Sequence, residues 1–161
     1  MSVTTDIVES WRRPQTVVRR HLQRGRSEAF AFSLLFVFLL VSFIAQIPGA
    51  ARVTALDPAV PMSAQMLAKG LGLLATIPVF YGLAALSQLA MRGVGGGYGA
   101  RIALFWSLVA VSPLVLLVGL VAGMIGTGNQ LVLCGVLTFA AFVFQWVTAL
   151  SAVRAQLGKA Q

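Results

Sequence analysis

Three long stretches without a single charged residue constrain this chain more than any other feature of its sequence. They are Ala29–Ala51, Gly70–Met91 and Ile102–Val153. A helix needs about 20 apolar residues to cross the hydrocarbon core of a bilayer, so each stretch is long enough for at least one crossing. Only 10% of the residues are charged, whereas soluble domains carry about 25%. These observations predict an all-α integral membrane protein.

The third stretch is too long for one crossing. Its 52 residues would measure roughly 78 Å as one helix, against about 30 Å of hydrocarbon. We expect it to turn back within 123–130, where three glycines and Asn129 tolerate the positive φ angles that turns need. The sequence thus predicts four transmembrane helices at about 29–48, 67–91, 102–124 and 130–151, with an N-terminal arm over 1–28 and a tail over 152–161.

Positive charge is divided unevenly between the two sides that four spans create. The arm, the 92–101 loop and the tail share one side and carry ten of the twelve Lys and Arg residues, whereas the other side carries only Arg52 and Lys69. Because Lys and Arg accumulate on the cytoplasmic side, we expect both termini in the cytoplasm. Arg is used far more often than Lys, beside abundant Ala and Gly, which is typical of a GC-rich bacterial genome and favours the bacterial inner membrane.

The net charge of +8 has an explanation in this orientation and in contact with anionic lipid headgroups. A reader of DNA or RNA would need its basic residues together with a recognition motif on a folded soluble face. We therefore expect membrane lipids as partners, and no nucleic acid.

The arm predicts two short amphipathic helices. Thr5 or Asp6 can cap the first, with Glu9 in a capping-box position, and Pro14 suits the first turn of the second. The second helix carries a narrow apolar stripe of Val17, Val18 and Leu22. We expect this stripe in the headgroup boundary of the membrane. The residues expected at the lipid headgroups are Trp11, Arg12, Arg13, Arg19, Arg20, Arg24 and Arg26. An unstructured, positively charged tail is the alternative.

Small residues and prolines indicate where the spans pack and bend. Gly82 in the second span and the Gly119-x-x-x-Gly123 pair in the third allow close approach of helix backbones. We expect these two spans to form the packed interior pair. Pro78 and Pro113 each remove a backbone hydrogen bond inside a span and should kink it, either statically or as a functional hinge.

Two connections are expected between the spans. Pro48 and Gly49 should end the first span, which leaves 50–65 as a short extracytoplasmic connection. The Gly-rich segment 93–99 lacks the Gly-Lys-Ser/Thr ending of a phosphate loop. We interpret it as a flexible hinge.

The residues needed for catalysis or metal binding are scarce. The only histidine is His21, and the four acids are Asp6, Glu9, Glu28 and Asp57, so no catalytic triad or metal-ligand set can be assembled. We expect no enzymatic activity, cofactor, metal site or small-molecule substrate. The lone Cys134 is interpreted as a packing residue, with a lipidation or redox role as the alternative.

Uncharged polar residues inside the spans are expected to form hydrogen bonds between helices, with a pore lining as the alternative. They are Thr76, Tyr81, Gln88, Ser107, Ser112, Thr138, Gln145 and Thr148.

Three segments carry a resemblance to a known family. They are the basic segment Arg13–Leu22, the Ile77-Pro78 pair inside a small-residue span, and above all Tyr98–Leu114, YGARIALFWSLVAVSPL. In this order they resemble bacterial members of the Yip1 family. The resemblance implies a multi-span helical membrane protein. Eukaryotic members of the family are associated with Rab GTPases and vesicle traffic, and have a longer cytoplasmic N-terminal part and usually five spans.

The function expected from these features is that of a non-catalytic membrane scaffold or accessory protein of Yip1 type, which contacts other membrane proteins or itself. Two alternatives are a small oligomeric channel or transporter, with Pro78 and Pro113 as gating kinks, and an accessory subunit of a larger energy-converting membrane complex.

Overall fold

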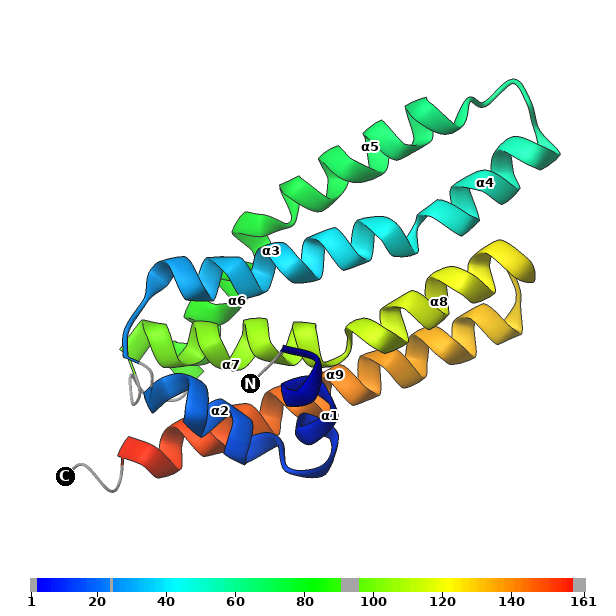
Figure 1. The fold of residues 1–161 in the computed structure, drawn as a ribbon. Coiled ribbons are helices and arrows are strands. Elements are labelled where there is room, and N and C mark those ends of the chain that lie inside the picture. The colour runs from blue at the N-terminus through cyan, green and yellow to red at the C-terminus, as the bar shows by residue number, and fades with distance from the viewer. Residues whose placement is uncertain (1–2, 24, 91–95, 158–161) are drawn as a thin grey trace.

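A computed structural model describes residues 3–23, 25–90 and 96–157, and all regular structure in these ranges is α-helical (Figure 1). Arg24, Arg92, Lys159 and the glycines at 93 and 95, to which the sequence assigned roles, lie outside these residues. In chain order the helices are α1 (Val3–Arg12), α2 (Pro14–Gln23), α3 (Glu28–Ala45), α4 (Ile47–Leu56), α5 (Met62–Ala75), α6 (Ile77–Ala90), α7 (Gly96–Ala110), α8 (Ser112–Met124) and α9 (Asn129–Leu157).

Three helical stretches are long and apolar enough to cross a membrane: Glu28–Leu56, Met62–Leu89 and Asn129–Ala155. A fourth consists of α7 and α8, which meet at a bend of 43° and count as a span if taken together. The helical class is therefore as expected, and its apolar helices are compatible with a membrane protein.

The first span is longer than the sequence analysis indicated, because Pro48 does not end it. The helix breaks for one residue at Gln46 and resumes as α4, with Pro48 in its first turn, where the missing N–H costs no hydrogen bond. Arg52 lies within this added helix, and the connection to α5 shrinks to residues 57–61.

The other spans also begin or end outside their expected limits. The second starts at Met62, with Pro61 in an extended conformation before it. Lys69 therefore lies about two turns inside α5. The third starts at Gly96, so the part of the expected hinge from Gly96 to Gly99 is helical, and the last helix continues to Leu157.

Each of the first three spans is broken just before a proline. Pro48, Pro78 and Pro113 are each the second residue of a helix, namely of α4, α6 and α8, and a single non-helical residue precedes each of these helices. Proline has no N–H to donate and its ring clashes with the carbonyl four residues earlier, so it is tolerated in the first turn of a helix but not in a continuous one. Only the break before Pro113 bends its span by more than 40°.

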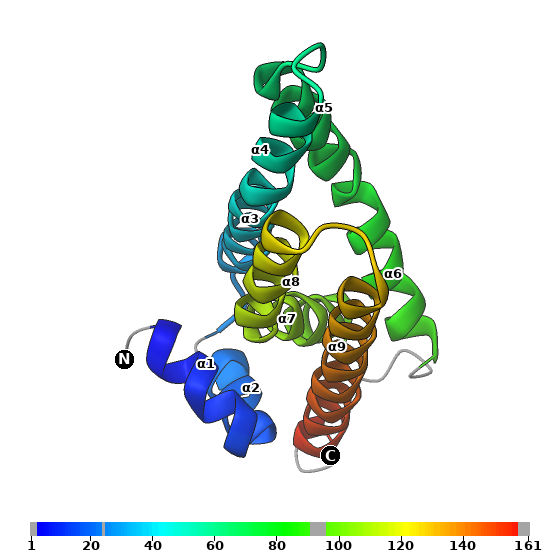
Figure 2. The same ribbon diagram turned by 90° about the vertical axis from the view of Figure 1, so that its right-hand side faces the viewer.

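Helix α7 lies at the centre of the molecule. It contacts α2, α3, α6 and α9, and every residue from Ile102 to Ala110 is buried (Figure 2). The first half of the second span is peripheral, since α5 has no buried residue, whereas α6 packs against α7. The packed interior pair therefore consists of the first and third spans, and not of the second and third.

The glycines explain this difference in packing. A Cβ built on Gly119 would clash with the carbonyl group of Ala45, and one on Gly123 would clash with Pro48, so the Gly-x-x-x-Gly pair packs against the first span. At Gly82, where a close helix contact was also expected, a Cβ would meet nothing within 4 Å.

Apolar side chains remain exposed along the outer faces of the spans. On the second span they run from Leu67 to Leu89, and on α9 from Val132 to Val147. Lipid tails or apolar partners can cover such surfaces, whereas water covers them at a cost.

Candidate functional site

The N-terminal arm is a helical hairpin seated on α7 and α9. Its two helices are joined at Arg13, whose backbone N–H donates to the carbonyl oxygen of Glu9 at 2.7 Å. Both helices contact α7, and α2 also lies against α9 (Figure 1). Residues 3–23 are helical almost throughout, which rules out the unstructured tail considered above.

The apolar stripe of the arm faces the protein. Val17 and Val18 are fully buried in one hydrophobic cluster with residues of α7 and α9, and Leu22 packs against that cluster. The expected position of this stripe in the headgroup boundary is therefore wrong. The stripe is buried against side chains of α7 and α9, which the sequence of the arm alone does not reveal.

Two side chains of the spans reach across to Ser10 in α1. The indole Nε1–H of Trp106 in α7 donates to the Ser10 hydroxyl at 2.8 Å, and the side-chain amide of Gln145 in α9 donates to the Ser10 carbonyl at 3.1 Å. All three residues are buried. Because a buried donor without an acceptor is costly, these two bonds favour the seated position of the arm.

Arg20 of α2 holds α1 in place through two carboxylates. Its guanidinium lies 2.9 Å from Asp6 and 3.1 Å from Glu9. The expected capping box is absent, since α1 begins at Val3 and both acids pair with Arg20 instead. Arg20 was expected at the lipid headgroups, but its guanidinium binds these two carboxylates and only 28% of its side chain is exposed.

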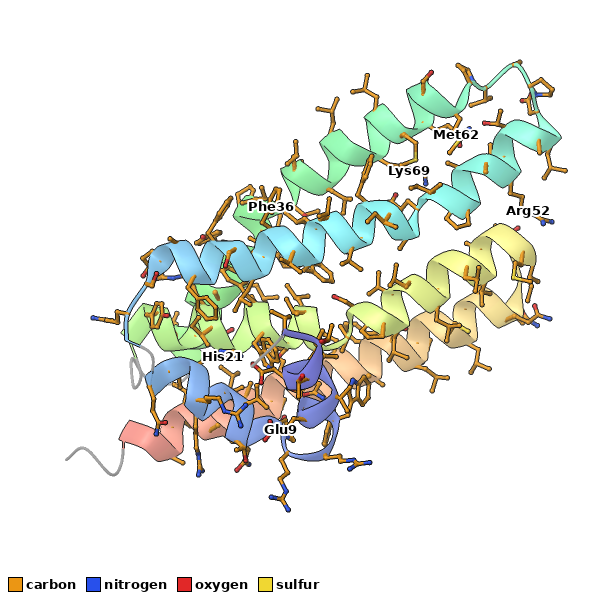
Figure 3. The ribbon with its side chains drawn as sticks, viewed as in Figure 1. Glu9, His21, Phe36, Arg52, Met62 and Lys69 are labelled. Atoms are coloured by element: carbon orange, nitrogen blue, oxygen red, sulfur yellow. The ribbon has the colours of Figure 1, made fainter. Side chains whose placement is uncertain are left out.

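His21 is buried where the arm packs against α3 and α7. It is 2% exposed, its ring centroid lies 4.4 Å from that of Trp106 and 5.4 Å from that of Phe30, and its Nε2 is 3.8 Å from Asp6. His21 and Glu9 come from the two different arm helices (Figure 3). No group of three or more metal-ligating side chains occurs in the described part of the chain. His21 follows Val17 by four residues and Val18 by three, a spacing that puts all three on one face of a helix. The sequence therefore contained a signal that His21 is buried with them.

The outer face of the arm carries the remaining headgroup candidates. Trp11 is 44% exposed, and Arg12 and Arg13 are exposed beside it. Arg26 is also exposed, but it lies in the connection between α2 and α3. Arg19 is half-buried. The structure thus separates the expected set into an outward group and a group turned toward the protein.

Further contacts tie together the ends of the helices that lie beside the arm. The Tyr98 hydroxyl donates to the carbonyl oxygen of Gly25 at 3.2 Å, and Arg101 pairs with Glu28 at the start of α3. The side-chain amide of Gln15 donates to Ser151 in α9 at 3.4 Å. The seat of the arm therefore continues into the entry of the first span.

Most polar side chains inside the spans do not connect different spans. The hydroxyls of Ser107, Thr138 and Thr148 donate to backbone carbonyls four residues earlier in their own helices. Across the breaks, the hydroxyl of Ser112 donates to Leu108 of α7 and that of Thr76 to Leu73 of α5, each within its own span. Gln145 differs, since it bonds to the arm. Ser107, Ser112 and Gln145 are buried, so they do not line the water-filled path that a channel would need.

Comparison with family models, with curated proteins and with solved structures finds no match to this chain.

Proposed function

We propose that this chain is a non-catalytic, four-span protein of the bacterial inner membrane, of Yip1 type, that acts as a scaffold for other membrane proteins. In this arrangement the arm and both termini lie in the cytoplasm, and Arg52 and Lys69 (Figure 3) lie toward the opposite side. The ten-to-two division of cations supports this orientation.

The exposed face of the second span is the observation that carries the scaffold proposal. Gly72 and Gly82 lie on this face, and a Cβ on either would meet nothing within 4 Å. In a bilayer, small residues let a neighbouring helix approach closely, which is how helices associate in lipid. The first and third spans, by contrast, already use their small residues on each other.

A groove beside this span adds to the available surface. It has a volume of about 500 Å³, lies between α3 and α5, and is lined by apolar side chains that include Phe36, Phe43 and Leu71. Within the second span, α5 thus presents open apolar surface, whereas α7 is enclosed. A buried central helix together with an exposed α5 suits a protein that binds other membrane proteins from the side.

The proposal is tested by affinity purification in mild detergent, followed by identification of the bound proteins. We expect a stoichiometric partner with the native chain, and its loss when Gly72→Leu and Gly82→Leu fill the open face. Gly135→Leu on α9 is the matched control, because a side chain there also meets open space. Capture of an energy-converting complex would assign the chain to that complex as an accessory subunit.

A different result would refute the scaffold. If the purified protein, reconstituted alone, moved a solute across vesicles or turned over a lipid, the chain would be a transporter or an enzyme.

A further inference from the structure

We infer that Val8 and Trp11 form an edge by which the seated arm enters the cytoplasmic lipid leaflet, with Arg12 and Arg13 on the phosphates of anionic lipids. This inference rests on the proposed membrane-spanning arrangement. It keeps Trp11, Arg12 and Arg13 from the residues expected at the headgroups, adds Val8, and leaves out the apolar stripe of α2, which is buried against the protein.

The two faces of α1 differ sharply in exposure. Asp6 and Ser10 are 2% and 0% exposed on the face toward the protein, whereas Val8 and Trp11 are 64% and 44% exposed. At 3.6 residues per turn, Val8 and Trp11 lie three residues apart on one side of the helix. Because the seat holds α1 in one rotation, this apolar side always points outward.

The hydrogen bond from Gln145 to Ser10 sets the level of α1 along the bundle. Gln145 is 16 residues after Asn129, the first residue of α9, or about 24 Å along the helix axis. The hydrocarbon core is about 30 Å thick, so a bilayer that begins near Asn129 still surrounds α9 at Gln145. Phe144 and Val147, at this level, are 58% and 57% exposed.

The outward side of α1 therefore meets lipid and not bulk water. Tryptophan is favoured at the boundary between tails and headgroups, where its ring is apolar and its N–H can bond. Val8 adds apolar surface next to Trp11, and short helices with such an edge insert shallowly.

Charge identifies the kind of lipid. Arg12 and Arg13 are exposed, and neither makes an ion pair with any residue in the described ranges. Arg20, by contrast, is neutralised by Asp6 and Glu9. Two adjacent free guanidinium groups at the membrane boundary favour phosphate groups with net negative charge.

The test uses the full chain in vesicles, with Cys134→Ser and one new cysteine carrying an environment-sensitive fluorophore. The cysteine replaces Val8, or Gln23 at the exposed cytoplasmic end of α2, or Val136 on the exposed face of α9. Quenching by lipids that carry a nitroxide on the acyl chain is then measured. We expect quenching and a blue-shifted emission at residues 8 and 136, and neither effect at residue 23.

Two results would overturn the inference, and they are distinguishable. If residue 136 is quenched and residue 8 is not, the arm does not touch lipid, although the chain spans the membrane. If residue 136 is not quenched either, the proposed membrane-spanning arrangement fails as well.

A second experiment tests the contact of Arg12 and Arg13 with anionic lipid. In phosphatidylcholine vesicles, addition of phosphatidylglycerol should increase the quenching at residue 8, and Arg13→Gln should reduce that increase. Arg26→Gln removes the same charge from an exposed position before α3 and should leave the increase unchanged. An equal loss with both variants would show that only overall charge matters, which contradicts a specific contact at Arg13.

Discussion

At the scale of single residues, Ser10 has an importance out of proportion to its size. Ser10→Ala would leave the indole N–H of Trp106 buried without its acceptor, which costs about 1–3 kcal/mol. We expect a lower midpoint of thermal unfolding in detergent, followed by near-UV circular dichroism. Thr16→Ala, at an exposed position of α2, is the control, and equal midpoints for the two variants would contradict the role assigned to Ser10.

Gly119 allows a second test at this scale. In Gly119→Ala the new methyl group would clash with the carbonyl of Ala45, so we expect destabilisation by about 1–3 kcal/mol, as for other overpacked sites. Gly135→Ala meets open space and should stabilise α9 by roughly 0.5–1 kcal/mol through helix propensity. The two variants should therefore shift thermal stability in opposite directions.

The sequence could predict part of these residue roles. The spacing of Gly119 and Gly123 predicted a close helix contact, but the partner expected for it, the second span, was wrong, because the pair describes only one of the two contacting surfaces. Ser10 carried no signal, since its role depends on Trp106 and Gln145, which follow it by 96 and 135 residues. The sequence around Trp106 or Gln145 does not indicate which residue accepts its hydrogen bond.

At the scale of elements, the seating of α2 predicts how the arm responds to loss of its stripe. Replacing Val17, Val18 and Leu22 together with Ser removes the apolar contact with α7 and α9. We expect faster cleavage by trypsin at the arm arginines, with no inversion of the spans. Thr16→Ser, at an exposed position of α2, is the control. Equal cleavage of the native chain and the triple variant would argue against the seat.

The pairing of α1 with α2 makes a separate prediction. Arg20→Gln leaves Asp6, whose side chain is 3% exposed, without its cationic partner, which costs about 2 kcal/mol for bonds to a charged group. Cleavage by trypsin after Arg12 should rise, while Arg26→Gln should leave it unchanged. A similar cleavage rate in both variants would show that the ion pairs do not hold α1.

The prolines show that tertiary contacts help to decide where a helix ends. Pro78 and Pro113 were expected to interrupt helices, and each stands just after a break. Pro48 followed by Gly49 is the usual signature of a helix end, yet α4 continues beyond it. Its packing against Gly123 of the third span supplies contacts that a local pattern cannot contain.

At the scale of the whole molecule, the contrast between α7 and α5 predicts uneven protection of the backbone. The amides of α7 should exchange with deuterium most slowly, because the helix is enclosed by its neighbours. Those of α5, which has no buried residue, should exchange faster in detergent micelles. Mass spectrometry of peptic fragments measures both, and equal rates would contradict this arrangement.

Long uncharged stretches and the distribution of arginine predict helices and a common side for the arm and tail. They do so because both depend on the summed character of many residues. The order of packing depends on a few contacts between distant segments, and the seat of the arm is of that kind.

The seat of the arm also has a consequence for biosynthesis. Ser10 and its partner Gln145 are 135 residues apart, and chains are made at about 5–20 residues per second, so the two are separated by roughly 7–27 s of synthesis. During that interval the α9 side chains that bury Val17 and Val18 have not been made. The arm therefore reaches its packed position only after the last helix is complete, although it is the first part of the chain to be synthesised.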